Sequence, residues 1–147
     1  MVKRSGFTFI EIILVLAIVM VVGVTSAALS NTFLVQESLE TAFEMLRADM
    51  CKAQLYAMSG KNASIWGVAL RDGDLVVFRG TGYDYRDDTF DERIALPRGV
   101  ILSGFDEAVF ERESGRLTEP MTGLSLDGAG SSISFSVNRE GSLEKSE

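Results

Sequence analysis

The chain has 147 residues, with 14 Lys and Arg against 21 Asp and Glu, and a formal net charge of −7. Its length and its 46 % of hydrophobic residues predict one folded domain rather than a disordered polar chain. One cysteine and no histidine exclude an internal disulfide framework, a cysteine-cluster metal site and every histidine-based catalytic triad. The acidic balance argues against binding to the phosphate backbone of nucleic acids.

Apolar residues are concentrated near the N-terminus. Residues 7–29 contain one charged residue, Glu11, and follow Lys3 and Arg4. As a helix rising about 1.5 Å per residue, this segment reaches roughly 35 Å, which is enough to cross a bilayer core of about 30 Å. The two basic residues predict a cytoplasmic N-terminus. Residues 30–147 then lie on the other side, with 12 basic and 20 acidic residues and a net charge of −8.

The helix is expected to continue beyond the predicted membrane span, from about Phe7 to about Ser59. Its second half is amphipathic, and Gly60 is a suitable C-terminal cap. Charged residues flank a stripe of apolar residues at spacings of three and four, which predicts a face that packs on a sheet: Leu39, Phe43, Leu46, Met50, Ala53 and Ala57.

After Gly60 the pattern changes to short strands separated by turns. Arg71–Asp74 has the composition of a hairpin turn, since Gly73 readily adopts a positive φ. Because the strands follow the helix and do not alternate with helices, we expect an α+β fold with an antiparallel sheet or sandwich on the second half of the helix. The predicted strands are Ser64–Leu70, Leu75–Arg79, Arg93–Leu96, Val100–Leu102, Ala108–Glu111, Gly123–Leu126, Ser132–Val137 and Ser142–Leu143.

Glu11 needs an explanation, because a carboxylate in an apolar membrane span costs about 2.5–3.5 kcal/mol on insertion scales. A secretory signal peptide has an apolar core of about 7–15 residues, shorter than the segment seen here. A plain transmembrane anchor fits the length but does not account for the charge.

The run from Lys3 to Glu11, leading directly into an apolar helix, resembles the N-terminal signal of type IV prepilins and type II secretion pseudopilins. The resemblance implies cleavage between Gly6 and Phe7 by a prepilin peptidase, and N-methylation of Phe7. The chain would then consist of a leader (1–6), a transmembrane and assembly segment (7–29) and a head (30–147). Many pilins carry a proline about twenty residues into this helix, and the chain lacks one near Gly23.

The same resemblance implies that Glu11 of one subunit faces the Phe7 amine of its neighbour in the fibre. That pairing would offset the cost of a buried carboxylate and set the axial register. The implied partners are other pilin or pseudopilin subunits, the peptidase and an inner-membrane assembly platform. The implied location is the bacterial inner membrane, with the head in the periplasm, and after assembly a pilus or pseudopilus. The resemblance implies neither a cofactor nor an enzymatic activity.

The segment Leu46–Ala53, with Trp66, Phe110 and Gly115, resembles the minor pseudopilins called GspH/FimT. This implies a sandwich-like head on a minor subunit that acts in protein secretion. Some members bind DNA through clustered C-terminal arginines. Here two basic residues after Val137 stand against three glutamates, which argues against DNA uptake.

Three features of the head have more than one interpretation. The acidic residues Asp84, Asp87, Asp88 and Asp91 either supply oxygen ligands for calcium or form a solvated loop, and their spacing is not that of an EF-hand. Cys51 is expected to be a small packed thiol and not a catalytic one, because no histidine is present to activate it. Trp66 is expected to be a core or sheet-face aromatic, with a binding platform as the alternative. The competing overall interpretation is a membrane protein with one span that does not assemble and whose β head binds a ligand.

Overall fold

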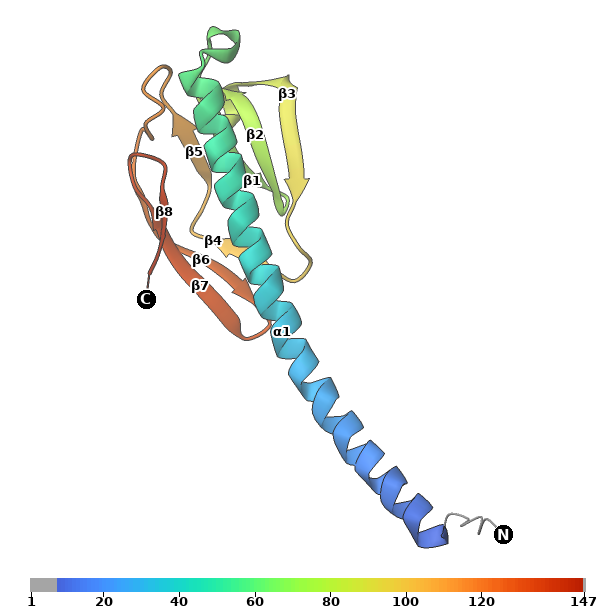
Figure 1. The fold of residues 1–147 in the computed structure, drawn as a ribbon. Helices are drawn as coiled ribbons and strands as arrows, with labels where there is room; N and C mark the ends of the chain where they lie inside the picture. Colours follow the sequence, from blue (N-terminus) through green and yellow to red (C-terminus); the bar gives the residue numbers. More distant parts are fainter. Residues whose placement is uncertain (1–7, 147) are drawn as a thin grey trace, which may run out of the picture. The chain divides into compact units, whose positions relative to one another are not determined.

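The computed structural model describes residues 8–146; within residues 22–35 it describes the course of the helix but not the side chains. The chain divides into two compact units, Met1–Leu34 and Val35–Glu147. A single helix, α1, spans Phe9–Met58 (Figure 1). The prediction of one long helix is confirmed over the described residues. Gly60 follows the helix in the left-handed conformation, with φ 63°, as predicted for its C-terminal cap.

The rest of the chain forms two antiparallel four-stranded sheets (Figure 1). Sheet A has the strand order β3-β2-β1-β5 and sheet B the order β4-β6-β7-β8. Two short 3-10 helices, η1 (Lys61–Ala63) and η2 (Tyr83–Tyr85), lie between these elements. The strands are β1 (Trp66–Arg71), β2 (Asp74–Gly80), β3 (Arg86–Ala95), β4 (Ile101–Ser103), β5 (Glu107–Phe110), β6 (Met121–Gly128), β7 (Ser131–Val137) and β8 (Leu143–Lys145).

The predicted α+β class and all the predicted strands are present. The hairpin turn between β1 and β2 is also confirmed, because Asp72 and Gly73 both have positive φ and Arg71 pairs with Asp74. The prediction was wrong about β3, which begins at Arg86 instead of Arg93. Its acidic first half looked like a loop, but this is the edge of sheet A, where charged side chains are compatible with a strand that has one neighbour.

Both sheets share one hydrophobic core with the second half of α1. Every member of the predicted apolar stripe is buried there. Phe43 packs edge-on against Phe135 of β7, with ring centroids 5.4 Å apart, and Tyr56 packs on Trp66 of β1 at 4.8 Å. Earlier turns of this half of α1 therefore contact sheet B, and later turns contact sheet A.

The membrane prediction is not tested as a whole. Within the described part of the chain, no helix is both long and apolar enough to cross a membrane. The predicted span 7–29 includes Phe7 and the side chains of residues 22–29, which lie outside that part.

Two glycines provide a matched test of the packing around β4 and β6. Gly104 and Gly123 both have positive φ, 77° and 70°. A Cβ on Gly104 would lie 2.8 Å from the carbonyl oxygen of Gly123, whereas a Cβ on Gly123 would meet open space. We expect Gly123→Ala to lower the free energy of unfolding by about 1–2 kcal/mol through backbone strain alone. Gly104→Ala should lower the free energy of unfolding by about 1–3 kcal/mol more than that, because the backbone at Gly123 must move to make room for the new Cβ. Urea unfolding of both variants measures the difference, and equal losses would contradict the contact.

Candidate functional site

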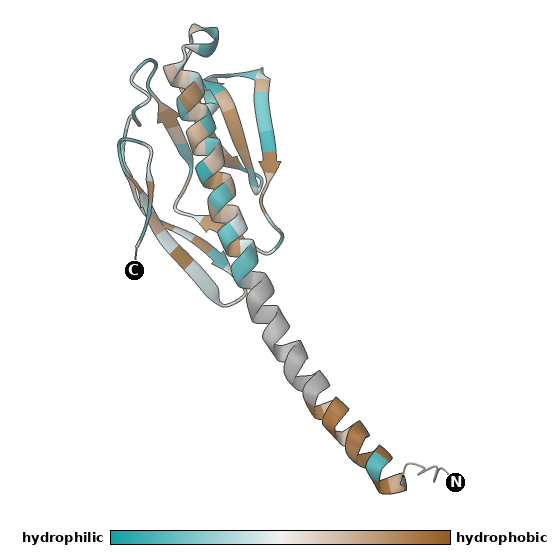
Figure 2. Ribbon diagram, viewed as in Figure 1, coloured by the Kyte–Doolittle hydropathy of each residue, from teal (hydrophilic) through white to brown (hydrophobic). Residues whose placement is uncertain are grey.

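The described start of α1 is an exposed apolar surface with a single charge. The large apolar side chains between Phe9 and Val21 are all at least 46 % exposed, and Phe9 reaches 80 %. In Figure 2 this part of the ribbon is mostly brown, with one teal band near its start. Continuous exposed apolar surfaces are typical of regions that contact lipid or other proteins.

Glu11 has a local role that the sequence analysis missed. It lies in the first turn of α1, and its Oε2 accepts a hydrogen bond of 3.4 Å from the backbone N–H of Thr8. The Thr8 carbonyl in turn accepts from the N–H groups of Glu11 and Ile12. This is the carboxylate half of a capping box, and its sequence signal is Thr8-Phe9-Ile10-Glu11. A negative charge there also interacts favourably with the helix dipole.

Gly6 and Phe7, the residues of the predicted cleavage and methylation, lie outside the described residues. Glu11 is therefore the member of the predicted assembly site whose geometry is known. The pairing expected for it involves a second subunit and stays a prediction.

The acidic residues considered for calcium are spread over η2 and β3. Asp91 accepts from the Arg86 guanidinium at 2.9 Å, and Asp87 lies 3.5 Å from that of Arg79. Asp84 and Asp88 are exposed. Among the described residues, no group of three or more acidic, cysteine or histidine side chains is arranged to hold a metal ion. The arrangement lends the calcium hypothesis no support.

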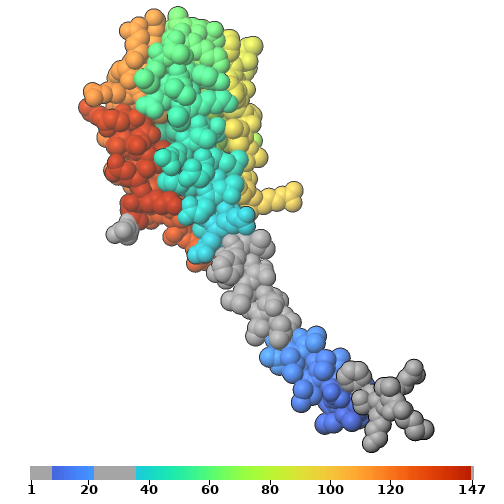
Figure 3. Space-filling view, viewed as in Figure 1, coloured from blue at the N-terminus to red at the C-terminus, as the bar shows by residue number. Residues whose placement is uncertain are grey.

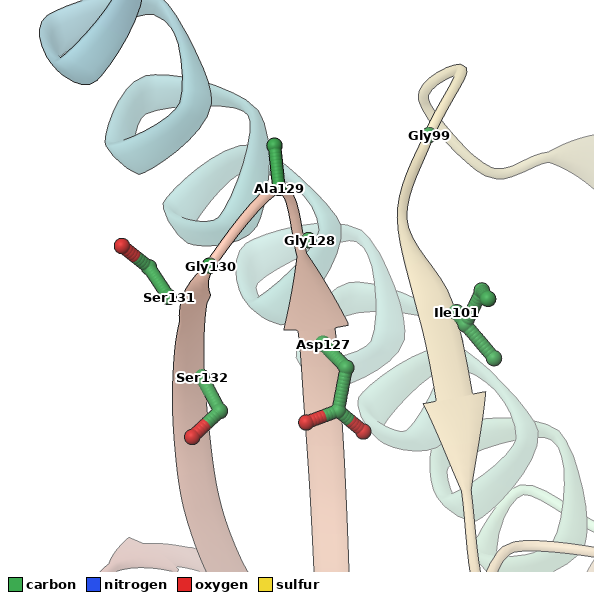
Figure 4. A pocket seen from close by; sticks show the side chains of 8 residues that line it. All are labelled: Gly99, Ile101, Asp127, Gly128, Ala129, Gly130, Ser131 and Ser132. Atoms are coloured by element: carbon green, nitrogen blue, oxygen red, sulfur yellow. The ribbon is translucent and has the colours of Figure 1, made fainter.

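A groove of about 340 Å³ lies between the β6–β7 turn and the start of β4 (Figure 4). Its polar side chains are Asp127, Ser131 and Ser132, and its walls include Ile101 and three glycines. Asp127 already accepts a hydrogen bond of 2.8 Å from Ser125. The groove brings together two hydroxyls and one carboxylate, and none of its lining residues carries a positive charge.

The sequence analysis also missed Asp49, the one polar residue among the buried side chains that the structure describes. It is 3 % exposed, and its Oδ2 has no hydrogen-bond partner. Burial raises the pKa of Asp49 to about 6, against a lowering influence of Lys52 and a raising one of Glu92. The signal in the sequence was its spacing from the stripe, since Asp49 follows Leu46 by three residues and precedes Ala53 by four.

Lys52 lies one turn after Asp49 and connects α1 to β3. Its ammonium donates a hydrogen bond to Oε2 of Glu92, and the Tyr56 hydroxyl donates to Oε1 at 3.4 Å. The bond to Glu92 raises the pKa of Lys52, and the same bond lowers the pKa of Glu92. Two carboxylates, Asp49 and Glu92, thus lie near one ammonium.

The two other residues singled out from the sequence differ in outcome. Trp66 is a core aromatic as predicted, 1 % exposed, and its indole N–H donates to the Lys61 carbonyl at 3.1 Å. The prediction for Cys51 was wrong, because this free thiol is exposed. Its position one residue beyond the buried Met50 places it on the outer face of the helix.

Comparison with known proteins gives a relationship at the level of fold. No family model matches the chain, and no curated protein matches its sequence. Among solved structures, the chain is similar to the minor pseudopilin EpsH from the type 2 secretion system of Vibrio cholerae, with a TM-score of 0.52 and 15 % identity. The match covers 74 % of this chain and 95 % of that chain. The chain therefore has a pseudopilin-like fold.

Asp49 predicts how stability depends on pH. Its raised pKa means that the folded chain disfavours the charged form, so its contribution is fully present below the ordinary value of 3.8 and is lost as pH rises through about 6. Between pH 5 and 7.5 we expect the free energy of unfolding to fall by about 1–2 kcal/mol more in the wild type than in Asp49→Asn. Urea unfolding at both pH values checks this, with the exposed Asp88→Asn as the matched control. A parallel pH dependence in wild type and Asp49→Asn would contradict it.

Proposed function

We propose that the chain is a pilin-like structural subunit that assembles through its N-terminal helix. The observation that supports this most strongly is the exposed apolar start of α1 with Glu11 as its one charge, in a chain whose fold is pseudopilin-like. The assembly in question is a type II secretion pseudopilus or a type IV pilus, with the subunit anchored in the bacterial inner membrane before assembly. The head would then face the periplasm.

Glu11 supplies the specificity in this proposal. Apolar helices attract one another in any register, because apolar packing is non-directional. A charged group buried among them favours the one register in which it is paired. The N-methylated amine of Phe7 in a neighbouring subunit is the partner proposed for Glu11, and cleavage after Gly6 creates that amine.

We further propose a minor, GspH/FimT-like subunit that acts in protein secretion, and no enzymatic activity. Its proposed partners are other pilin or pseudopilin subunits, the prepilin peptidase and the assembly platform. The net charge of −8 over residues 30–147 disfavours a role in DNA uptake, because phosphate would be repelled. The main alternative is a membrane protein with one span that does not assemble.

Replacing Glu11 by Gln separates assembly from helix capping. Glutamine still accepts a hydrogen bond from the Thr8 N–H but carries no charge to pair with an amine. We expect Glu11→Gln to be inserted and processed like the wild type, and to be depleted at least tenfold from sheared fibres of the native host. Immunoblots of fibre and membrane fractions measure this.

The matched control is Glu44→Gln, which removes an exposed carboxylate of α1 whose neighbour is Arg47 at 3.7 Å. It should assemble normally. If Glu11→Gln is incorporated into fibres as efficiently as the wild type, Glu11 has only its capping role, and the proposed register function is contradicted.

Processing is tested independently by the mass of the chain. In the native host the chain should begin at Phe7 and carry one N-terminal methyl group, as read by intact-mass spectrometry. Gly6→Leu should leave residues 1–6 attached, because a bulky side chain replaces the one residue without a Cβ at the proposed cleavage site. A wild-type chain that retains its leader in the native host would overturn the prepilin interpretation.

A further inference from the structure

Side-chain hydrogen bonds to Glu92 join α1 to the edge strand β3. Within the described strands, β3 pairs with β2 and has no strand on its other side. Figures 1 and 3 show β3, in yellow, alongside the last turns of α1, in green. Lys52 and Tyr56, one turn apart on α1, both donate hydrogen bonds to Glu92 of β3. These two bonds tie the edge strand to the helix.

Asp49 competes with Glu92 for that ammonium. It precedes Lys52 by three residues, so the two side chains lie on neighbouring positions of the helix surface. Asp49 is buried, and its Oδ2 has no hydrogen-bond partner, whereas Glu92 is half-buried and has two donors. Since an unpaired buried charge is costly, a charged Asp49 attracts Lys52, and Glu92 would keep the Tyr56 hydroxyl and its solvent contact if Lys52 moved away.

The charged groups that act on Asp49 are Lys52 of α1 and Glu92 of β3. Lys61, in η1, acts in turn on Glu92. The side chains that the strands of both sheets add to the core around α1 are apolar, among them Val77 of β2 and Phe135 of β7. The response of Asp49 to pH is thus controlled by one ammonium and one opposing carboxylate.

We propose that Asp49 is a proton-controlled latch between α1 and β3. With a proton on Asp49, Lys52 is committed to Glu92 and the edge strand is held on the helix. When Asp49 loses its proton, Lys52 is drawn back toward it, the bond to Glu92 weakens, and β3 loosens. Acidification therefore closes the contact between α1 and β3, which we call the seam. The proposal concerns the head alone and holds whether or not the chain assembles into a fibre.

The single tryptophan provides a reporter of the seam. Trp66 contacts Tyr56 of α1 at 4.8 Å and Phe90 of β3 at 6.2 Å between ring centroids. The chain has no histidine, so the ordinary source of a transition between pH 5 and 7 is absent. We expect Trp66 emission from the full-length chain in detergent micelles to change with a midpoint near pH 6, the value to which burial raises the pKa of Asp49.

Three variants test whether Asp49 acts through the bond between Lys52 and Glu92. Asp49→Asn should abolish the transition of Trp66 emission. Lys52→Gln and Glu92→Gln should abolish it as well, because each removes the bond that the charge of Asp49 is proposed to weaken. A flat wild-type curve, or a transition that persists in any of the three variants, would overturn the proposal.

Hydrogen exchange provides a second measurement that does not depend on fluorescence. The β7 peptide, residues 131–137, serves as the internal reference for the β3 peptide, residues 86–95, because the ratio of their exchange rates cancels the intrinsic effect of pH. Between pH 5 and 7.5 the protection of β3 relative to β7 should fall about three- to tenfold in the wild type and stay constant in Asp49→Asn. A constant ratio in the wild type would overturn the proposal.

Discussion

The head depends on one apolar stripe of α1 that both sheets must cover. Sheet A and sheet B are separate hydrogen-bonded units, and each contributes side chains to the same core. The helix contacts sheet B through Phe43 of the stripe, and Tyr56 beside the stripe contacts sheet A. A sheet with one apolar face cannot remain uncovered in water, so the helix determines where each sheet lies. A cavity opened in the middle of this stripe would weaken both sheets at once.

Much of this arrangement could be predicted because the signals were periodic. The spacing of Leu39, Phe43 and Leu46 defined the packing face, and Asp72-Gly73 defined a turn that needs positive φ at both residues. The start of β3 was missed because its residues are charged, and an edge strand is where local composition and strand formation disagree. Asp49 was missed for a similar reason, since its charge gave no indication of burial although it is 3 % exposed.

Glu11 and Asp49 present the same physical problem in two settings. Each is a carboxylate beside apolar side chains on one helix, where a negative charge is costly. Glu11 has a hydrogen-bond donor, and Asp49 instead keeps its proton to a higher pH. Glu11 lies at the first turn, where free backbone N–H groups and the helix dipole favour an anion. Asp49 lies far from either end of α1, where no such groups exist, and its pKa rises instead.

The capping geometry bears on how Glu11 could serve assembly. A carboxylate that enters an apolar environment without any donor carries a large desolvation cost, which would oppose both insertion and packing. The Thr8 N–H supplies one donor within the same chain, which offsets part of that cost. The bond is long, at 3.4 Å, and a carboxylate has two oxygens, so a cationic amine can be added without breaking the cap. Capping and intersubunit pairing are therefore compatible roles of one residue.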